Sequence, residues 1–188
     1  MARPKSDDKR DAILAAAIRV IAAQGLSAPT AAIAKEAGVS NGSLFTYFET
    51  KADLLNHLYL EIKTEAAAAT LDGLPLKADL RKQAWHSWKS TLDWASSFPA
   101  KRRVLALLTV SDEITAASKN RGHQIMAGVA AQIDRTRKEG PLRNAPLLFV
   151  VGIMNALVDA TTEFMIKDPA NAEKHCKAGF ESFWRVVA

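Results

Sequence analysis

Small polar side chains between Ser40 and Lys51 have types and spacing that suit a binding chemistry. Leu44, Phe45 and Phe48 recur at helical spacing, so a helix here would turn these three inward and its polar residues outward. Small amide and hydroxyl groups can contact the base edges and methyl groups of DNA, whereas a phenol or an ammonium group can hold a phosphate. The candidate contacts are Ser40, Asn41, Gly42, Ser43, Thr46, Tyr47 and Lys51.

Two short helices that meet at Gly38 would position these side chains. Thr30 can cap the first helix, whose inner face would be Ile33, Ala34 and Ala37. Gly38 can take the left-handed conformation that ends this helix, and Ser40 can cap the second. A helix this short is unstable alone in water, so its neighbours must hold it. This is the arrangement of a helix-turn-helix.

Longer helices are predicted on both sides of this pair. Ser6 would begin a helix whose buried stripe is Ile13, Leu14, Ala17, Ile18 and Ile21 and which Gly25 ends. Thr50 would cap a fourth helix that runs to about residue 69, with Asp53 completing a capping box. The apolar face of this fourth helix continues past the DNA-contacting part, so we expect it to connect the two halves of the chain.

The residues around the helix pair form an ordered set from Arg10 to Leu58. They are Asp-Ala-Ile-Leu-Ala-Ala-Ala after Arg10, then Gln24-Gly25, Ile33-Ala34, Ala37-Gly38-Val39-Ser40, Gly42-Ser43-Leu44-Phe45, Tyr47-Phe48 and Lys51-Ala52-Asp53-Leu54-Leu55. This set resembles the N-terminal DNA-binding domain of the TetR family of transcriptional regulators, and it covers the first third of the chain. Phe45 stands where the family most often has Tyr and lacks a hydroxyl that could reach a phosphate, and the connection from Gly25 to Ile33 is slightly short.

The resemblance implies an all-α protein with a helix-turn-helix DNA-binding domain at residues 1–63 and a helical effector-binding and dimerisation domain at residues 64–188. It implies a ligand-responsive transcriptional repressor that binds a palindromic operator as a homodimer and is released by a small-molecule effector. Two other hypotheses remain open. One is an architectural DNA-binding protein without an effector, and the other is a small-molecule-binding helical protein with a vestigial DNA-binding domain.

The resemblance also assigns roles to the candidate contacts. Asn41, Ser43 and Thr46 would contact base edges or methyl groups, Gly42 would let the backbone approach closely, and Tyr47 and Lys51 would hold phosphates; the alternative is that all are solvated turn residues. Thr30 at a helix start and the Arg3/Lys5 arm would contact a phosphate or the minor groove. Their alternative is a helix cap and a terminal tail.

Composition limits the other function classes. The net charge of +5 does not mark the DNA-binding third, because residues 1–63 carry a net charge of +1. Cys176 is the single cysteine, the longest apolar run (147–158) is short of a bilayer span of about 20 residues, and no signal-peptide pattern opens the chain. We therefore expect a cytoplasmic protein. The four histidines show no metal-ligand spacing and no phosphate loop or nucleophile motif occurs, so we predict no enzyme, no metal and no cofactor.

The second region is also expected to be helical, with segments at about 79–97, 101–117, 123–138, 146–167 and 172–187. A kink or turn is expected at 119–122, and the whole chain would have about nine helices. The 146–167 segment is apolar nearly all round, so we expect it to be buried on most sides. Pairing it and the C-terminal helix across a two-fold axis, through residues of about 146–187, would give a four-helix dimer interface. One deep intramolecular core is the alternative.

An effector pocket is expected among the helices between residues 79 and 165. Trp85 and Trp88 lie one turn apart and are its main candidates, although a core position is the alternative for each. Asn155, Asp159 and Glu163 form a polar strip along an apolar helix and would face either the pocket or the dimer interface. Less certain members are His86, Phe98, Met126 and Phe149.

Overall fold

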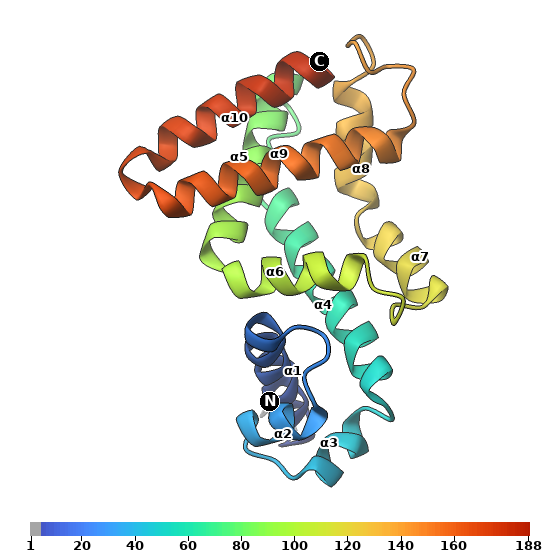
Figure 1. The fold of residues 1–188 in the computed structure, drawn as a ribbon. Coiled ribbons are helices and arrows are strands. Elements are labelled where there is room, and N and C mark those ends of the chain that lie inside the picture. Colours follow the sequence, from blue (N-terminus) through green and yellow to red (C-terminus); the bar gives the residue numbers. More distant parts are fainter. Residues whose placement is uncertain (1–4) are drawn as a thin grey trace. The chain divides into compact units, whose positions relative to one another are not determined.

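The computed structural model describes residues 5–188, with side chains described from Asp8 onward. All regular elements in this part of the chain are helical, which confirms the prediction of an all-α protein (Figure 1). They are α1 (Lys5–Gln24), α2 (Thr30–Glu36), α3 (Asn41–Tyr47), α4 (Lys51–Leu71), α5 (Leu80–Ser97), α6 (Pro99–Thr109), α7 (Ala116–Ile125), α8 (Ala127–Thr136), α9 (Leu147–Lys167), the 3-10 helix η1 (Pro169–Asn171) and α10 (Ala172–Val187).

The helix boundaries between residues 99 and 138 differ from the prediction. Three helices, α6 to α8, replace the two expected at 101–117 and 123–138. Residues 119–122, expected to form a kink or turn, lie inside α7. The chain leaves α6 early because side chains there bind the local backbone: the Ser111 Oγ accepts from the Glu113 N–H at 3.1 Å, and the Thr115 Oγ1 accepts from the Ser118 N–H at 3.1 Å. Such local bonds compete with helix continuation and mark a new helix start.

The contacts divide the chain into two compact units. One comprises residues up to Lys63 together with Pro99–Gly122, and the other comprises Thr64–Phe98 and His123–Ala188. α6 and most of α7 therefore pack with the N-terminal helices, whereas the sequence placed them in the second region. The functional domains at 1–63 and 64–188 stay a prediction.

The core of the first unit is formed by apolar side chains of α1 to α4 and α6. Its largest fully buried side chains are Ile13, Leu14, Ile21, Ile33, Leu44, Phe48, Leu54, Leu55, Leu58, Ile62 and Leu108. α1 packs against both α2 and α6, and α2 packs against α3. The short helices α2 and α3 thus obtain from this core the stability that their length cannot supply.

Asn56 joins α4 to the segment between α6 and α7. Its Nδ2 donates to the Ala52 carbonyl at 2.7 Å and to the Glu113 carbonyl at 2.8 Å, and its Oδ1 accepts from the Thr115 N–H at 3.0 Å. α7 approaches α4 closely, since a Cβ added at Gly122 would lie 2.8 Å from Cε1 of Tyr59. These contacts explain why α6 and α7 belong to the first unit.

The second unit is built around the pair α9 and α10, which packs on α5 and α8. Its core holds Trp88, Val129, Ile133, Val150, Val158, Cys176, Phe180, Phe183 and Val187. The Trp88 ring stacks on that of Phe183, with centroids 5.7 Å apart and planes at 17°. Gly179 permits the close approach of three helices, because a Cβ there would lie 2.3 Å from Oγ1 of Thr161 and 2.8 Å from Cζ2 of Trp88.

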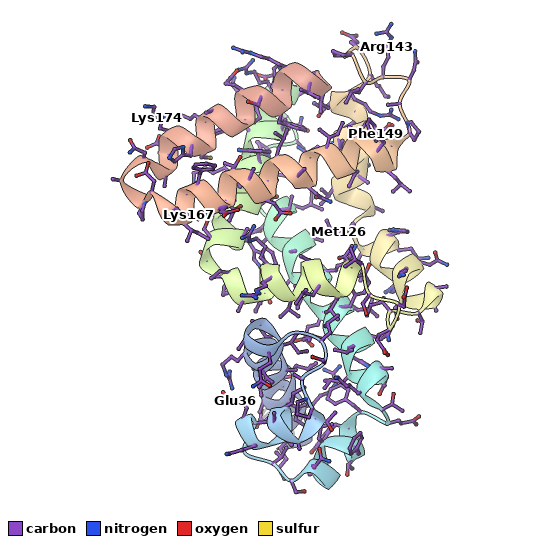
Figure 2. The ribbon with its side chains drawn as sticks, viewed as in Figure 1. Glu36, Met126, Arg143, Phe149, Lys167 and Lys174 are labelled. Carbon is purple, nitrogen blue, oxygen red and sulfur yellow. The ribbon has the colours of Figure 1, made fainter. Side chains whose placement is uncertain are left out.

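α9 is less buried within the chain than its sequence predicts. It is 21 residues long and apolar enough, by length and composition, to cross a bilayer, yet only 22% of its most apolar window is buried. Leu148 is 71% exposed, Phe149 57% and Phe164 59%, and Figure 2 shows Phe149 on the first turns of the helix. The core of the second unit therefore covers one side of this helix, through residues such as Val150 and Val158, and leaves its large apolar side chains on the other side exposed.

Candidate functional site

The turn between α2 and α3 is fixed by backbone hydrogen bonds. Gly38 has a φ of 69°, its N–H donates to the Lys35 carbonyl at 3.1 Å, and the Val39 N–H donates to the Ala34 carbonyl at 3.0 Å. This pair of bonds is the Schellman arrangement that ends a helix in a left-handed residue. Ser40 then caps α3, because its Oγ accepts from the Ser43 N–H at 3.0 Å. The predicted roles of Gly38 and Ser40 in the turn are therefore confirmed.

The start of α2 differs from the prediction. Pro29 is the residue before the helix, with φ −71° and ψ 145°, and it makes no side-chain cap. Thr30 is the first helical residue and is half-buried. The prediction that Thr30 caps this helix is wrong, because the proline already provides the extended entry conformation one position earlier.

Leu44 and Phe48 fix α3 to the first unit. Both side chains are 0% exposed. The Phe48 ring meets His57 edge-on at 5.5 Å between centroids, and the Arg10 guanidinium carbon lies 5.5 Å from the Phe48 ring centroid. Two apolar anchors one turn apart set the rotation of this helix about its axis, so its opposite face has a defined direction.

The face of α3 opposite the anchors is small and polar. Asn41, Gly42 and Thr46 are exposed, and Ser43 and Tyr47 are half-buried. The Thr46 hydroxyl donates to the Gly42 carbonyl at 3.3 Å, so its proton is used within the helix and its oxygen can still accept a hydrogen bond. A Cβ added at Gly42 would meet nothing closer than the Ser40 Oγ at 4.0 Å, so this position presents bare backbone to the surroundings.

Phe45 does not point inward as its spacing predicts. It is 40% exposed, whereas Leu44 and Phe48 fill the space below α3. The reason is geometric, because neighbours along a helix are separated by about 100° and only one of Leu44 and Phe45 can face a narrow core. The exposed ring adds an apolar group to the same end of the unit as the polar residues.

Three residues separate Lys51 from the end of α3. It is the first residue of α4 and half-buried. The Asp53 N–H donates to the Thr50 Oγ1 at 3.0 Å, so Thr50 caps α4 as predicted. The Asp53 Oδ2 accepts from the Glu49 N–H at 3.1 Å, one residue before the cap, whereas the predicted capping box would use the Thr50 N–H. The predicted arm contact Arg3 lies outside the described residues, as does the side chain of Lys5.

The second unit contains a small cavity of about 30 Å³ that is lined mostly by buried residues. One side of it is apolar and belongs to α5, α8, α9 and α10, with lining residues Ala84, Trp88, Val129, Ile133, Met154, Val158 and Phe183. The other side is polar and includes the end of α4, with lining residues Thr70, Ser87, Thr91, Gln132 and Thr136. All of these polar residues were missed by the sequence interpretation, although Ser87/Thr91 and Gln132/Thr136 each have the i, i+4 spacing of one helix face.

The residues predicted for an effector pocket are dispersed, and Trp88 is the one that lines this cavity. Its indole N–H donates to the Cys176 carbonyl at 3.0 Å. Trp85 lines a separate surface hollow with Phe180, whose ring it meets edge-on at 5.0 Å. The others lie elsewhere: His86 bonds through Nε2 to the Asp72 carbonyl, Phe98 and Phe149 are exposed, Met126 lies between α7 and α8 (Figure 2), and Asn155, Asp159 and Glu163 are exposed along α9.

Nothing in the described side chains indicates catalysis. No group of three or more His, Cys, Asp and Glu side chains in the described residues could hold a metal ion. Burial raises the pKa of the Cys176 thiol, so the thiolate that would act as a nucleophile is disfavoured. The marked carboxyl shifts are at exposed groups, such as Asp168, whose pKa is lowered by its hydrogen bond from His175.

Comparison with known proteins agrees with this geometry. The family profile described as "Bacterial regulatory proteins, tetR family" matches residues 13–58. A crystal structure from Shewanella sp. PV-4, assigned to the TetR family of transcription regulators, has 29% sequence identity and a TM-score of 0.83, covering 94% of this chain and 96% of that one.

Two further structures share the fold over nearly the whole chain. A TetR family transcription regulator from Marinobacter aquaeolei VT8 has 24% identity and a TM-score of 0.86, covering 100% of this chain and 99% of that one. FadR from Bacillus subtilis, solved in complex with stearoyl-CoA, has 18% identity and a TM-score of 0.71, covering 95% of this chain and 99% of that one.

Proposed function

Because this chain is a TetR family transcriptional regulator with an N-terminal helix-turn-helix domain, we propose that it is a repressor that binds a palindromic operator as a homodimer and is released by a small-molecule effector. The family is one of DNA-binding regulators and not of enzymes. The observation that carries the proposal is the exposed face of α3, which is formed by Asn41, Gly42 and Thr46. The fully buried side chains of Leu44 and Phe48 hold the opposite face of this helix in the core.

Each exposed group on α3 has a role in this proposal. The Asn41 amide can donate to and accept from one base edge, and the Thr46 methyl can contact a thymine methyl. Gly42 lets the backbone approach the duplex and Ser43 contacts a base edge, while Tyr47, Lys51 and Thr30 bind phosphates that fix the register. Ser40 contributes chiefly by fixing the start of the helix, since its Oγ is engaged with the Ser43 N–H.

The exposed apolar surface of α9 supports dimerisation. Leu148, Phe149 and Phe164 are more than half exposed in the single chain, on a helix that also packs along α10. Large exposed apolar patches mark interaction surfaces, and a symmetric pair of α9 and α10 helices would bury them in a four-helix interface. In this arrangement the strip Asn155, Asp159 and Glu163 lies toward the partner and not toward the cavity.

A dimer is needed because one α3 makes few contacts. Two copies related by a two-fold axis place their two α3 helices in successive major grooves of the DNA, about 34–36 Å apart. We therefore expect each operator to contain two inverted half-sites. A bacterial cytoplasm, where the chromosome lies, is the location that follows.

α4 is the element that would transmit the effector signal. Lys51 at its start belongs to the candidate DNA surface, and Thr70 near its end lines the cavity. A helix of this length spans roughly 30 Å. An effector that displaces the end of α4 would shift its start and change the separation of the two α3 helices. A coupling of about 1–3 kcal/mol would weaken operator binding roughly 5- to 150-fold. FadR from Bacillus subtilis, which has this fold, was solved with stearoyl-CoA and so holds a small molecule.

The experiment is selection of bound genomic fragments followed by anisotropy titration of the selected duplex. The double variant Asn41→Ala/Thr46→Ala should lose sequence-selective binding and remain a folded dimer. Its matched control is Asn120→Ala/Thr109→Ala: both control residues are exposed, and the Thr109 hydroxyl donates to the Leu105 carbonyl at 2.7 Å as Thr46 does to Gly42. The control should bind like the parent. Unchanged operator affinity in the α3 double variant would refute the assigned surface.

A further inference from the structure

The hydroxyl groups around the cavity have already used their protons. Thr70 donates to the Ala66 carbonyl at 2.8 Å, Thr91 to the Ser87 carbonyl at 2.8 Å, and Thr136 to the Gln132 carbonyl at 3.0 Å. The Ser87 hydroxyl donates to Oε1 of Gln132 at 2.6 Å. Each hydroxyl has a single proton, so none of the four remains as a donor to a molecule inside the cavity.

The Gln132 amide is the exception. The residue is 3% exposed, and its Nε2 has no hydrogen-bond partner in the described part of the chain. The 2.6 Å separation from Ser87 is typical of an O–H···O bond and short for N–H···O, which supports oxygen as the amide atom facing Ser87. A buried N–H without an acceptor is unfavourable. An occupant that brings an acceptor removes this cost, so the cavity favours molecules that carry one.

Charge is excluded from this cavity by its lining. Its lining residues are the polar and apolar residues named above, and none of these described side chains is ionisable at neutral pH. An ion that enters would lose its hydration without gaining a counter-charge, which strongly disfavours binding. The remaining wall consists of aliphatic and aromatic carbon, which favours an apolar occupant.

The size of the cavity adds a further condition. A volume of about 30 Å³ holds little more than a water-sized group, so a larger molecule must displace part of the wall. Met154 of α9 is half-buried and lines the cavity. Its unbranched side chain has three rotatable bonds and adapts its shape more readily than the aromatic and β-branched residues around it.

We propose that the effector is an uncharged, largely apolar small molecule with a hydrogen-bond acceptor, and that Gln132 donates its free N–H to that acceptor while Met154 moves aside. This inference rests on the proposed function, since it names the chemical class that the regulatory site takes. The acceptor can be a carbonyl, ether or hydroxyl oxygen, because each offers a lone pair to the amide.

Four probes of similar size test the chemical class: acetophenone, ethylbenzene, benzoate and benzylammonium. Each is titrated into ¹⁵N-labelled full-length protein, and affinity is read from the indole signal of Trp88. Acetophenone should bind about 2- to 10-fold more tightly than ethylbenzene, the gain expected of one neutral hydrogen bond. Benzoate and benzylammonium should bind at least about tenfold more weakly than acetophenone, because neither charge is compensated.

The side-chain amide signals report on Gln132 directly in the unmodified protein. Acetophenone should move the Gln132 amide protons downfield, and ethylbenzene should not. Gln83 is the internal control, because it is also buried and its Nε2 already donates to the carbonyls of Leu76 and Ala78 at 3.2 and 2.7 Å. Its signals should stay unchanged. In the Gln132→Met variant the affinity ratio of acetophenone to ethylbenzene should fall to about one.

Several results would overturn the proposal: equal affinity for acetophenone and ethylbenzene in the parent, tighter binding of either ion, binding of no probe, or a Gln132 signal that does not respond. These measurements contain no DNA, so a failure of this inference can be distinguished from a failure of the proposed function. A protein that ranks the probes as expected but selects no DNA sequence would refute the regulator and keep the site. One that selects an operator but binds no probe would refute the effector class alone.

Discussion

Gly42→Ala separates folding from DNA contact at a single position. Gly42 is the second residue of α3, and its φ is not positive. A Cβ there would meet nothing closer than the Ser40 Oγ at 4.0 Å, so the protein has room for the methyl group. Alanine is a better helix residue than glycine by about 0.5–1 kcal/mol. We therefore expect the variant to be more stable than the parent.

The substitution should raise the folding stability and lower the affinity for the operator. A gain of about 0.5–1 kcal/mol should raise Tm by about 1–4 °C for a chain of this size. If the α3 backbone approaches the duplex at Gly42, the added methyl occupies space that DNA needs. The loss should be comparable to that of one base-edge contact, about 1–3 kcal/mol, which weakens operator binding roughly 5- to 150-fold.

Calorimetry and anisotropy titration on the same preparation measure the two effects. Gly38→Ala is the matched control, because a Cβ there also meets nothing within 4 Å but φ is +69°. That control should lose about 1–2 kcal/mol from left-handed strain, which lowers Tm by about 2–8 °C. A Gly42→Ala variant that is more stable and binds the operator as tightly as the parent would refute the close approach. One that is less stable would refute the reading of the local geometry.

Three further predictions concern other parts of the chain. Lys51→Ala should weaken binding to all DNA sequences and reduce, by about one, the steepness with which the logarithm of the binding constant falls with the logarithm of the salt concentration. Titrations at several salt concentrations measure this slope, and an unchanged slope would exclude a phosphate contact. Ala156→Arg, on the exposed face of α9, should convert the dimer to a 20.4 kDa monomer in sedimentation. The control variant Ala131→Arg on α8 should stay dimeric. If both variants are dimers, the interface lies elsewhere. Asn56→Ala should cost about 1–3 kcal/mol in urea unfolding, because the Thr115 N–H loses its acceptor, and an unchanged midpoint would mean that the segment after α6 does not depend on this contact.

The helix-turn-helix could be predicted because its signals are local. Gly38 ends α2 through its own positive φ, and Ser40 and Thr50 begin α3 and α4 through bonds to residues three positions ahead. None of these bonds depends on distant parts of the chain. The predictions that failed nearby involve competition between neighbours. Thr30 has the chemistry of a cap, but Pro29 takes the entry position, and Phe45 has the hydrophobicity of a core residue, but Leu44 fills that space.

The cavity could not be predicted in the same way, because its polar side joins residues that are far apart in sequence. Ser87 and Gln132 are 45 positions apart, and each alone reads as a polar residue on an amphipathic helix. Only the packing of α5 against α8 shows that they face each other in a buried position. The same holds for α9, whose composition predicts burial but does not say by what. Interactions between residues close in sequence thus specify the candidate DNA surface, whereas the regulatory properties proposed for this chain depend on long-range packing. Substitutions in the two sites should therefore separate DNA recognition from effector response.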